Sequence, residues 1–170
     1  MGMDYLRGKR ILVVDDEPDV PDVIEESLPM AEVIKVYSFA EAKEILETQY
    51  FDVAILDIMG VDGYKLLAIA NEKKVVAVML TAHALSLEDT VKSYKEGAAS
   101  FIPKEEMVNI ATFLNDVFEA KEKGKSFWWR WFDRFASLYD KRFGPAWQKN
   151  DKEFWDSFIE SGKKNHYPSQ

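Results

Sequence analysis

Short apolar runs that end in acidic residues are the feature that most constrains the fold of this chain. Residues 11–14 precede Asp15 and Asp16, and residues 53–56 precede Asp57. Apolar runs of this length without polar alternation are typical of parallel strands buried on both faces. Because ligands bind outside the carboxyl ends of such strands in open α/β sheets, we expect these acids to meet at one edge of a sheet.

Strand and helix signals alternate over residues 1–120. Strands are expected at residues 11–14, 33–36, 53–56, 75–80 and 99–102, and helices at residues 20–28, 64–70, 86–96 and 105–120 and after Ser38. Ser38 and Glu41 form a capping-box pattern, and Ser86 and Gly97 stand where a helix would begin and end. This alternation predicts an α/β fold built from βαβ units around a parallel sheet.

The composition excludes several classes of function. No Cys is present, so disulfides, thiolate metal sites and cysteine nucleophiles are ruled out. Residues 1–10 lack the apolar segment of a secretion signal, and no apolar stretch approaches the ~20 residues that a membrane-spanning helix needs. The expected location is therefore cytoplasmic.

Charge and aromatic content divide the chain into two parts. Residues 1–120 hold 11 Lys and Arg against 23 Asp and Glu, whereas residues 121–170 hold 11 against 7. All five Trp lie in the second part. We therefore predict a main domain of residues 1–122 and an aromatic-rich helical C-terminal extension of residues 123–170.

The clustered acids indicate a particular chemistry. Asp57 can attack a phosphoryl group, because an aspartate is ionised at neutral pH and needs no prior deprotonation. Asp15 and Asp16 beside it would repel an anionic phosphoryl group unless a hard divalent cation bridged the acids. Mg²⁺ takes one or two carboxylates together with waters and phosphoryl oxygens, so the three acids predict Mg²⁺ as the cofactor.

A family resemblance rests on five positions at the ends of the expected strands. They are Asp15, Asp16, Asp57, Thr81 and Lys104. In this order and spacing they resemble the receiver domain of two-component response regulators, over roughly residues 8–120. The resemblance implies a flavodoxin-like doubly wound sheet of strand order 2-1-3-4-5 with helices on both faces. It also implies a histidine kinase or phosphotransfer protein as the partner that supplies the phosphoryl group.

The resemblance implies a role for each residue of the site. Asp16 and Asp57 would bind Mg²⁺ directly, Asp15 would bind it partly through water, and the backbone carbonyl of Met59 would complete the protein's ligands. Lys104 would bond a phosphoryl oxygen and stabilise the spread charge of the transition state.

The same resemblance implies a conformational switch. The hydroxyl of Thr81 would move toward the phosphoryl group, for which Ala82 leaves room, and the ring of Phe101 would turn inward. This movement would reshape the face made by the fourth helix, the fifth strand and the fifth helix.

Plainer structural roles stay open for several of these side chains. Thr81 could cap the following segment, and Phe101 could simply pack in the core. His83 could be a surface residue rather than one that controls water near the phosphoryl group. Asp52 and Asp62 are expected to be solvated loop acids.

Two departures from the family pattern occur beside the site. The loop at residues 58–63 is shorter than usual and lacks a proline, so kinetics cannot be carried over from the family. Proline precedes Lys104 as Pro103 instead of following it, and Glu105 comes next. A cis bond before a residue other than proline costs ~3–4 kcal/mol, so the Lys104–Glu105 bond is expected to be trans.

Apolar side chains of the extension follow two helical stripes. The first holds Trp128, Trp131, Phe132, Phe135, Leu138 and Tyr139, and the second holds Trp147, Phe154, Trp155, Phe158 and Ile159. The first predicted helix is capped by Ser126 and ended by Gly144 and Pro145, and the second ends near Gly162.

Three roles for the extension stay open. Its rings can pack in a helical hairpin or on the main domain, form a self-association or partner surface, or lie at a membrane surface, with residues 126–160 providing the contact. The extension lacks helix-turn-helix composition and the basic density that DNA requires, so no direct DNA binding is expected.

Together these features predict a phosphorylated signalling switch rather than a metabolic enzyme, acting on an unknown downstream protein through protein contacts. One alternative is an adaptor that works without phosphorylation through its aromatic tail, against which all five site residues argue. Another is a phosphotransferase or hydrolase of the haloacid-dehalogenase type. That class needs an acid two residues after the nucleophile, where this chain has Met59.

Overall fold

The chain contains a five-stranded parallel sheet flanked by helices. A computed structural model describes residues 4–82 and 86–166. The strands are β1 (Arg10–Val14), β2 (Glu32–Val36), β3 (Val53–Asp57), β4 (Val76–Thr81) and β5 (Ser100–Pro103). All neighbouring strands are parallel, in the order β2-β1-β3-β4-β5. The predicted strand order is therefore confirmed.

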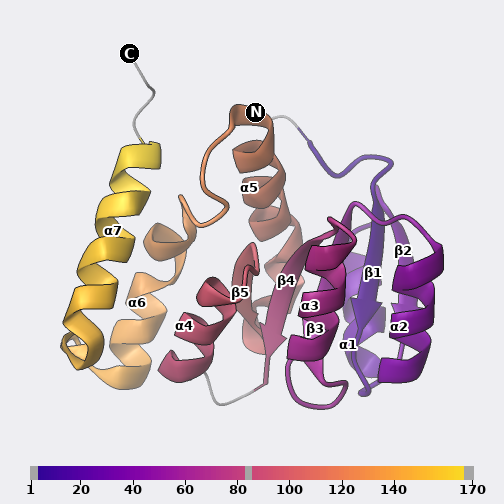
Figure 1. Cartoon of the computed structure of the whole chain (residues 1–170), viewed down its shortest axis with the longest axis horizontal. Coiled ribbons are helices and arrows are strands. Elements are labelled where there is room, and N and C mark those ends of the chain that lie inside the picture. The colour runs from indigo at the N-terminus through magenta and orange to yellow at the C-terminus, as the bar shows by residue number, and fades with distance from the viewer. Residues whose placement is uncertain (1–3, 83–85, 167–170) are drawn as a thin grey trace. The chain divides into compact units, whose positions relative to one another are not determined.

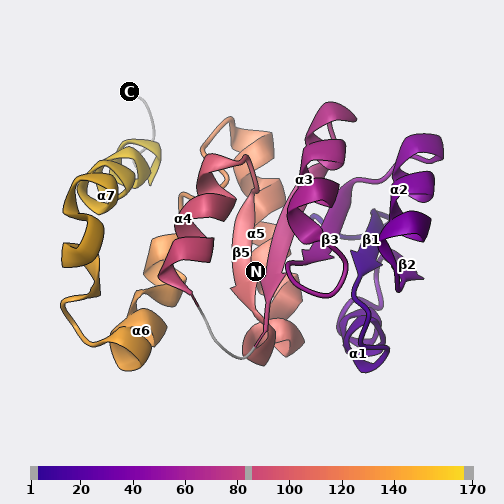
Figure 2. The same ribbon diagram turned by 60° about the horizontal axis from the view of Figure 1, so that its bottom comes forward.

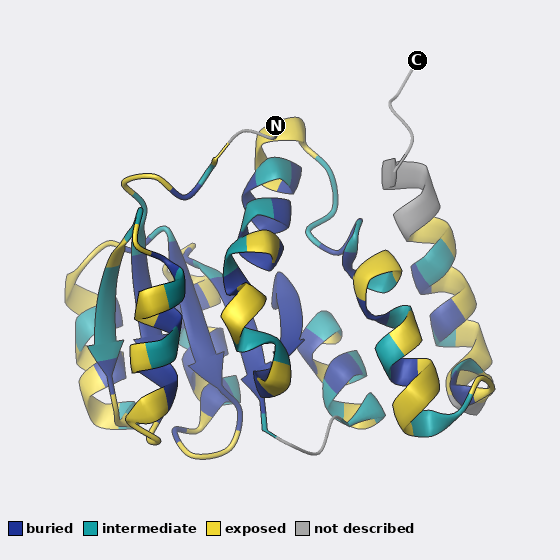
Figure 3. Cartoon of the chain, turned by 180° about the vertical axis from the view of Figure 1, so that it is seen from behind, coloured by how far each residue is buried: buried dark blue, intermediate teal, exposed yellow. Residues whose placement is uncertain are grey.

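Helices cover both faces of this sheet. They are α1 (Asp19–Ser27), α2 (Phe39–Thr48), α3 (Gly63–Glu72), α4 (Leu87–Lys95) and α5 (Ile110–Lys123). The ribbon shows α2, α3 and α4 on one face, and α1 and the first turns of α5 on the other (Figures 1 and 2). Strands β1, β3, β4 and β5 are buried apart from the first residues of β1 and β4, and the buried strands are dark blue in Figure 3. The edge strand β2 is buried only at Val36. Burial on both faces explains the apolar runs at residues 11–14, 53–56 and 76–80.

Local signals set several helix ends as predicted. The Ser38 hydroxyl accepts a hydrogen bond from the backbone N–H of Glu41 at 3.3 Å, and the Ser86 hydroxyl accepts one from Asp89 at 3.1 Å. Both residues therefore satisfy backbone donors that the first turn of a helix leaves unpaired. After α4, Gly97 adopts a φ of 93°, which favours glycine at a helix end.

The segment after β5 differs from the prediction. Residues 104–109 form a 3₁₀ helix, η1 (Lys104–Asn109), and α5 begins only at Ile110. The Ile110 N–H bonds the carbonyl of Met107, three residues back. Apolar spacing does not separate this tighter turn from an α-helix, because three-residue and four-residue repeats are compatible with both. No cis peptide bond occurs in residues 4–82 and 86–166, so the trans Lys104–Glu105 bond is confirmed.

Side chains tie α3 to α4. The Tyr64 hydroxyl donates to the carboxylate of Asp89 at 2.9 Å and lies 3.3 Å from the Ser93 hydroxyl. Further along, the Asn71 side chain donates to the Glu96 carbonyl at 2.8 Å, where α4 ends. Helix α4 is thus held to α3 at both ends.

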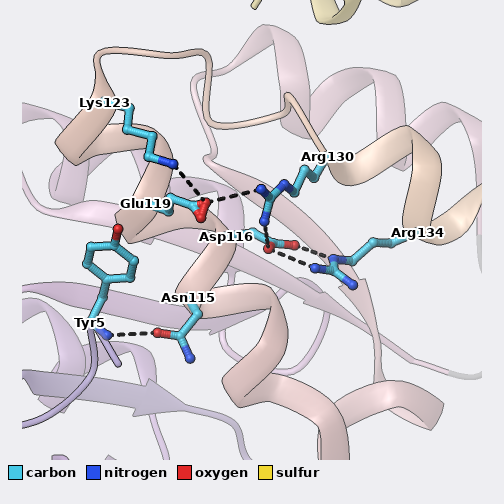
Figure 4. A network of polar contacts seen from close by, with 7 residues as sticks. All are labelled: Tyr5, Asn115, Asp116, Glu119, Lys123, Arg130 and Arg134. Carbon is cyan, nitrogen blue, oxygen red and sulfur yellow. Dashed lines mark hydrogen bonds and ion pairs between the residues drawn. The ribbon is translucent and has the colours of Figure 1, made fainter. Parts of the chain in front are cut away.

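The chain divides into two compact units, residues 1–115 and residues 116–170. The division falls inside α5, upstream of the boundary predicted at residues 122–123. The first half of α5 belongs to the sheet-containing unit, where the Tyr5 N–H donates to the Asn115 side chain at 2.9 Å (Figure 4). A change of composition did not reveal this division, because one continuous helix contributes to both units.

The second unit holds the two predicted helices and a short turn between them. They are α6 (Trp131–Phe143), the 3₁₀ helix η2 (Trp147–Asp151) and α7 (Lys152–His166). Gly144 ends α6 with a φ of 84°, as predicted. Two predicted helix ends are wrong. Ser126 does not cap α6, because its hydroxyl accepts the N–H of Trp128 at 3.2 Å in a turn that precedes the helix. Helix α7 does not end near Gly162 but continues to His166.

Aromatic rings form the core of this second unit. Trp131 lies 5.3 Å from Tyr139 and 6.5 Å from Trp155, and Trp147 lies 5.0 Å from Tyr139 and 4.7 Å from Trp155, between ring centroids. The indole N–H of Trp147 donates to Asp140 at 2.7 Å. These contacts fit the expectation that the rings pack within a helical hairpin. No helix in the described ranges is long and apolar enough to cross a membrane.

Ion pairs join the end of α5 to the start of α6 (Figure 4). Arg134 binds both carboxylate oxygens of Asp116, and Arg130 lies 3.2 Å from Glu119 and 3.5 Å from Asp116. The hydrogen bonds with Asp116 raise the pKa of the Arg134 guanidinium above its usual value. These pairs explain why the second half of α5 clusters with the extension.

Candidate functional site

The register of the sheet brings the predicted site residues to one edge. Val14 pairs with Leu56, so Asp15 and Asp57, which follow these residues, come to lie on neighbouring strands. Thr81, the last residue of β4, pairs with Pro103, so the next residue, Lys104, lies just beyond the end of β4. Parallel strands place their carboxyl ends together, and the expected meeting of these side chains follows from that geometry.

Lys104 lies among three carboxylates. Its Nζ is 2.9 Å from Asp15 Oδ2, 3.1 Å from Glu17 Oε1 and 3.3 Å from Asp57 Oδ1. Asp15 is fully buried, and the side chain of Lys104 is only 8% exposed. One buried ammonium thus faces a larger number of acids, and the site carries excess negative charge.

The acids fit a divalent cation. Asp15, Asp16 and Asp57 each offer a carboxylate oxygen, and these three oxygens lie within 4.8 Å of one another. Asp15 Oδ2 is buried and has no hydrogen bond, although Lys104 is close. A hard cation would satisfy this oxygen and offset the excess charge. The side chain of Met59 points to solvent, and only its backbone carbonyl is a candidate ligand.

Burial and pairing shift the pKa values of two groups. Burial raises the pKa of the Asp15 carboxyl above its usual value, against the opposing effects of the Glu17 N–H and Lys104. Burial alone would lower the pKa of the Lys104 ammonium, but its contacts with Asp15 and Glu17 outweigh burial and raise that pKa. Lys104 is therefore a permanent cation, while ionised Asp15 is held at a cost in folding free energy.

We expect Asp15→Asn to stabilise the metal-free protein at neutral pH. A raised pKa means that folding favours protonated Asp15, so its contribution to stability is present at low pH and is lost as pH rises through the folded pKa. Asn removes that loss. Urea denaturation in EDTA at neutral and acidic pH measures this gain, which should shrink at acidic pH. The exposed residue Asp19, changed to Asn, should show no gain, and a less stable Asp15→Asn protein would contradict this account.

Two glycines accommodate the shortened loop after β3. The Gly60 N–H donates to Asp57 Oδ2 at 3.0 Å. A Cβ at Gly60 would lie 2.1 Å from Asp16 Oδ1, and a Cβ at Gly63 would lie 2.2 Å from the backbone oxygen of Asp57. Close approach to the backbone of Asp57 therefore requires glycine at position 63, whereas a methyl group at position 60 would have to displace the Asp16 carboxylate.

Gly60→Ala is expected to weaken Mg²⁺ binding by about tenfold, a loss comparable to that caused by removing a supporting contact at a metal site. The added methyl group must displace Asp16 or the loop. Isothermal titration calorimetry with Mg²⁺ measures the affinity. Met59→Ala in the same loop, where the side chain is 78% exposed, is the control and should bind Mg²⁺ like the wild type. Equal affinities in all three proteins would refute the proposed role of Gly60.

The remaining predicted residues have mixed outcomes. Thr81 is buried at the end of β4, and Phe101 is fully buried in β5. These positions are compatible with a switch role and with a core role alike. His83 lies outside the described residues. Asp62 is exposed, as expected, but Asp52 is not a free loop acid, because its carboxylate accepts the Arg10 N–H at 2.8 Å and the Tyr50 hydroxyl at 2.9 Å.

Glu17 is the residue that sequence reasoning missed. It contacts Lys104 and follows Asp15 by two residues in the same turn. The available signal was a third consecutive acid after the first strand. Such a residue is usually a solvated helix-start acid, and the side-chain contact across the fold does not follow from spacing.

The fold and site define a class of protein. A family model for the response regulator receiver domain matches residues 11–114. The chain belongs to the receiver-domain family of two-component response regulators. Receiver domains generally bind Mg²⁺ at an acidic pocket and interact with histidine kinases or phosphotransfer proteins.

Individual relatives agree with this assignment. The chain is 34% identical over 99 residues to the heme response regulator HssR of Staphylococcus aureus (strain JH9). The aligned region covers 55% of this chain and 43% of that protein. It therefore spans less than half the length of that relative.

Solved structures show the same fold. A CheY-like receiver domain protein from Methanospirillum hungatei JF-1 matches with a TM-score of 0.62 and 28% identity, over 69% of this chain and 98% of that chain. The response regulator DrrB of Thermotoga maritima matches with a TM-score of 0.58 and 23% identity, over 70% of this chain and 55% of that one. The family match ends at residue 114, before the aromatic unit.

Proposed function

We propose that this chain is a phosphorylation-dependent response regulator whose phosphoacceptor is Asp57. The observation that supports this most is the arrangement around Asp57, in which a buried lysine ammonium lies 3.3 Å from one carboxylate oxygen and two further acids lie beside it. This arrangement has a nucleophile, a countercharge and a cation site within one pocket. The donor is a phosphohistidine of a kinase or phosphotransfer protein.

The transfer needs little covalent chemistry from the chain. A carboxylate oxygen of Asp57 forms a bond to phosphorus while the bond from phosphorus to the donor breaks, and the leaving group keeps that electron pair. Lys104 bonds a phosphoryl oxygen, and the Gly60 N–H holds Asp57 in place. When bound to Asp15, Asp16, Asp57 and the Met59 carbonyl, Mg²⁺ supplies positive charge that offsets the phosphoryl oxygens.

Haloacid-dehalogenase enzymes hydrolyse their phosphorylated intermediate with an acid two residues after the nucleophile. Met59 occupies the position of that acid, and its side chain is exposed. The acyl phosphate therefore persists as a signal rather than turning over, and the chain acts as a switch and not as a metabolic enzyme.

The signal leaves the site through side-chain packing. Thr81 and Phe101 are the proposed switch residues, and both are buried on adjacent strands. Helix α4 follows Thr81 and is tied by Tyr64 to α3, which begins directly after the loop beside Asp57. A change at Asp57 can thus reach α4 through Thr81, which precedes α4, or through the loop and α3, which Tyr64 bonds to α4. We propose the face of α4, β5 and α5 as the surface that a downstream protein recognises.

We propose that the C-terminal unit is a folded output or docking module for this switch. The rings that a membrane or partner surface would use pack on one another instead. An adaptor that works without phosphorylation remains a second candidate, because this unit has an aromatic core of its own.

Incubation with acetyl phosphate and Mg²⁺ should add one phosphoryl group to the wild-type chain, and EDTA should prevent it. Asp57→Asn should gain none, because an amide is no nucleophile toward phosphorus. Intact-mass spectrometry measures the gain. Asp52→Asn is the matched control and should be phosphorylated like the wild type; equal labelling of Asp57→Asn would refute the assignment of the acceptor.

A further inference from the structure

We propose that Glu17 is a positioning residue for Lys104, which holds the ammonium group beside Asp57 while a cation occupies the acid cluster. The inference rests on the proposed phosphoryl transfer to Asp57. It adds a residue that lies outside the receiver motif.

The contact between the two side chains is the first support. Lys104 Nζ donates a hydrogen bond to Glu17 Oε1 at 3.1 Å. The ion pair with Asp15 is shorter, at 2.9 Å, but Asp15 Oδ2 has no hydrogen bond. A charged donor and acceptor in hydrogen-bond geometry fix direction as well as distance. Glu17 therefore supplies an orienting hydrogen bond to the ammonium group from the rim of the site, in addition to the ion pair with buried Asp15.

The backbone of Glu17 is itself fixed. Its N–H donates to Asp15 Oδ1 at 2.9 Å, and its carbonyl accepts the N–H of Val20 at 3.0 Å, at the start of α1. The side chain of Glu17 is 60% exposed and so lies at the rim of the site. The fixed backbone limits where the Glu17 carboxylate can reach, so only its side chain has to be ordered to hold Lys104.

The distribution of charge gives Glu17 a role that the other acids cannot fill. Asp15, Asp16 and Asp57 form the group whose oxygens could hold a metal, and Glu17 does not belong to that group. A divalent cation among these three would draw their oxygens and repel the nearby ammonium. Glu17 is then the carboxylate partner that keeps Lys104 in place.

Charge and position predict opposite effects of Glu17→Gln. By charge alone, loss of a negative group at the rim should speed the approach of an anionic phosphoryl donor. Loss of a positioning contact should slow the transfer, because Lys104 would be less well placed to stabilise the transition state. The sign of the change therefore separates the two effects.

A double-mutant cycle tests the contact without any phosphoryl transfer. The wild type, Glu17→Gln, Lys104→Met and the double variant are unfolded in urea, in EDTA and in saturating Mg²⁺. We expect coupling of about threefold or more in the unfolding equilibrium constant, retained in Mg²⁺. A parallel cycle with Asp19→Asn, an exposed acid at the start of α1, should show none. Coupling that vanishes in Mg²⁺ would overturn the proposal.

Kinetics with acetyl phosphate test the consequence. Glu17→Gln should lower the limiting rate of phosphorylation about threefold to fivefold with little change in Mg²⁺ affinity, and Glu17→Asp should recover part of the loss. In the Lys104→Met background, Glu17→Gln should cause no further loss. A faster Glu17→Gln protein would overturn the proposal. If the wild type accepts no phosphoryl group, the proposed function fails, while the coupling in Mg²⁺ still decides the role of Glu17.

Discussion

Trp147→Ala should unfold the aromatic unit of residues 116–170 and leave phosphorylation of Asp57 intact. Trp147 is 1% exposed, its ring lies 4.7 Å from Trp155 and 5.0 Å from Tyr139, and its indole N–H is bonded to Asp140. Truncation of a buried Trp to Ala typically costs about 3–5 kcal/mol. A small unit has only a few kcal/mol of stability to lose, so the loss is expected to exceed it.

Tryptophan fluorescence measures this outcome selectively, because all five Trp lie in residues 116–170. The emission of the four that remain should shift to the red at temperatures where the wild type is folded. Lys149→Ala, an exposed change in the same 3₁₀ helix, should keep the wild-type spectrum. An unfolding midpoint of Trp147→Ala equal to that of Lys149→Ala would show that the rings form no cooperative core.

Lys104→Met should have opposite effects on metal binding and on phosphoryl transfer. Removal of the ammonium leaves Asp15 and Asp57 as buried acids without their cation, a loss that typically costs about 3–5 kcal/mol. Mg²⁺ should restore most of this stability and should bind more tightly than in the wild type, since it no longer competes with a cation. Phosphorylation should nevertheless fall about a hundredfold, as when one preorganised donor is lost from a transition state.

Urea denaturation in EDTA and in Mg²⁺, together with intact-mass kinetics, separates these effects. The matched control is Lys35→Met, which removes another lysine that pairs with two acids, here Asp22 and Glu25 of α1 rather than acids of the site. It should change neither the response to Mg²⁺ nor the rate of phosphorylation. If Lys104→Met gained no more stability from Mg²⁺ than this control, the competition between ammonium and metal would be refuted.

The sheet and the meeting of the site residues were predictable because they depend on patterns along the chain. Apolar runs that end in Asp15 and Asp57 indicate parallel strands, and parallel strands bring their carboxyl ends together. The caps at Ser38 and Ser86 follow from hydrogen bonds within one turn. Such features need only local chemistry and one rule of topology.

Other features depend on side-chain positions that spacing does not contain. Glu17 meets Lys104 across 87 residues, and Asp52 gains its partners from the packing of β1 beside β3. The role of Gly60 follows from how closely the shortened loop approaches Asp16. The start of α6 at Trp131 was missed because Trp128 keeps the helical spacing while it lies in the preceding turn. In each case the deciding contact is tertiary.

Chemical trapping of the phosphorylated residue is the most direct test of the central claim that Asp57 is the acceptor. Borohydride reduces an acyl phosphate at its carboxyl carbon, and peptide mass mapping then locates the reduced side chain. After incubation with acetyl phosphate, we predict reduction at Asp57 and only when Mg²⁺ is present. Reduction at Asp15, at Asp16 or at no residue would contradict the account of the site.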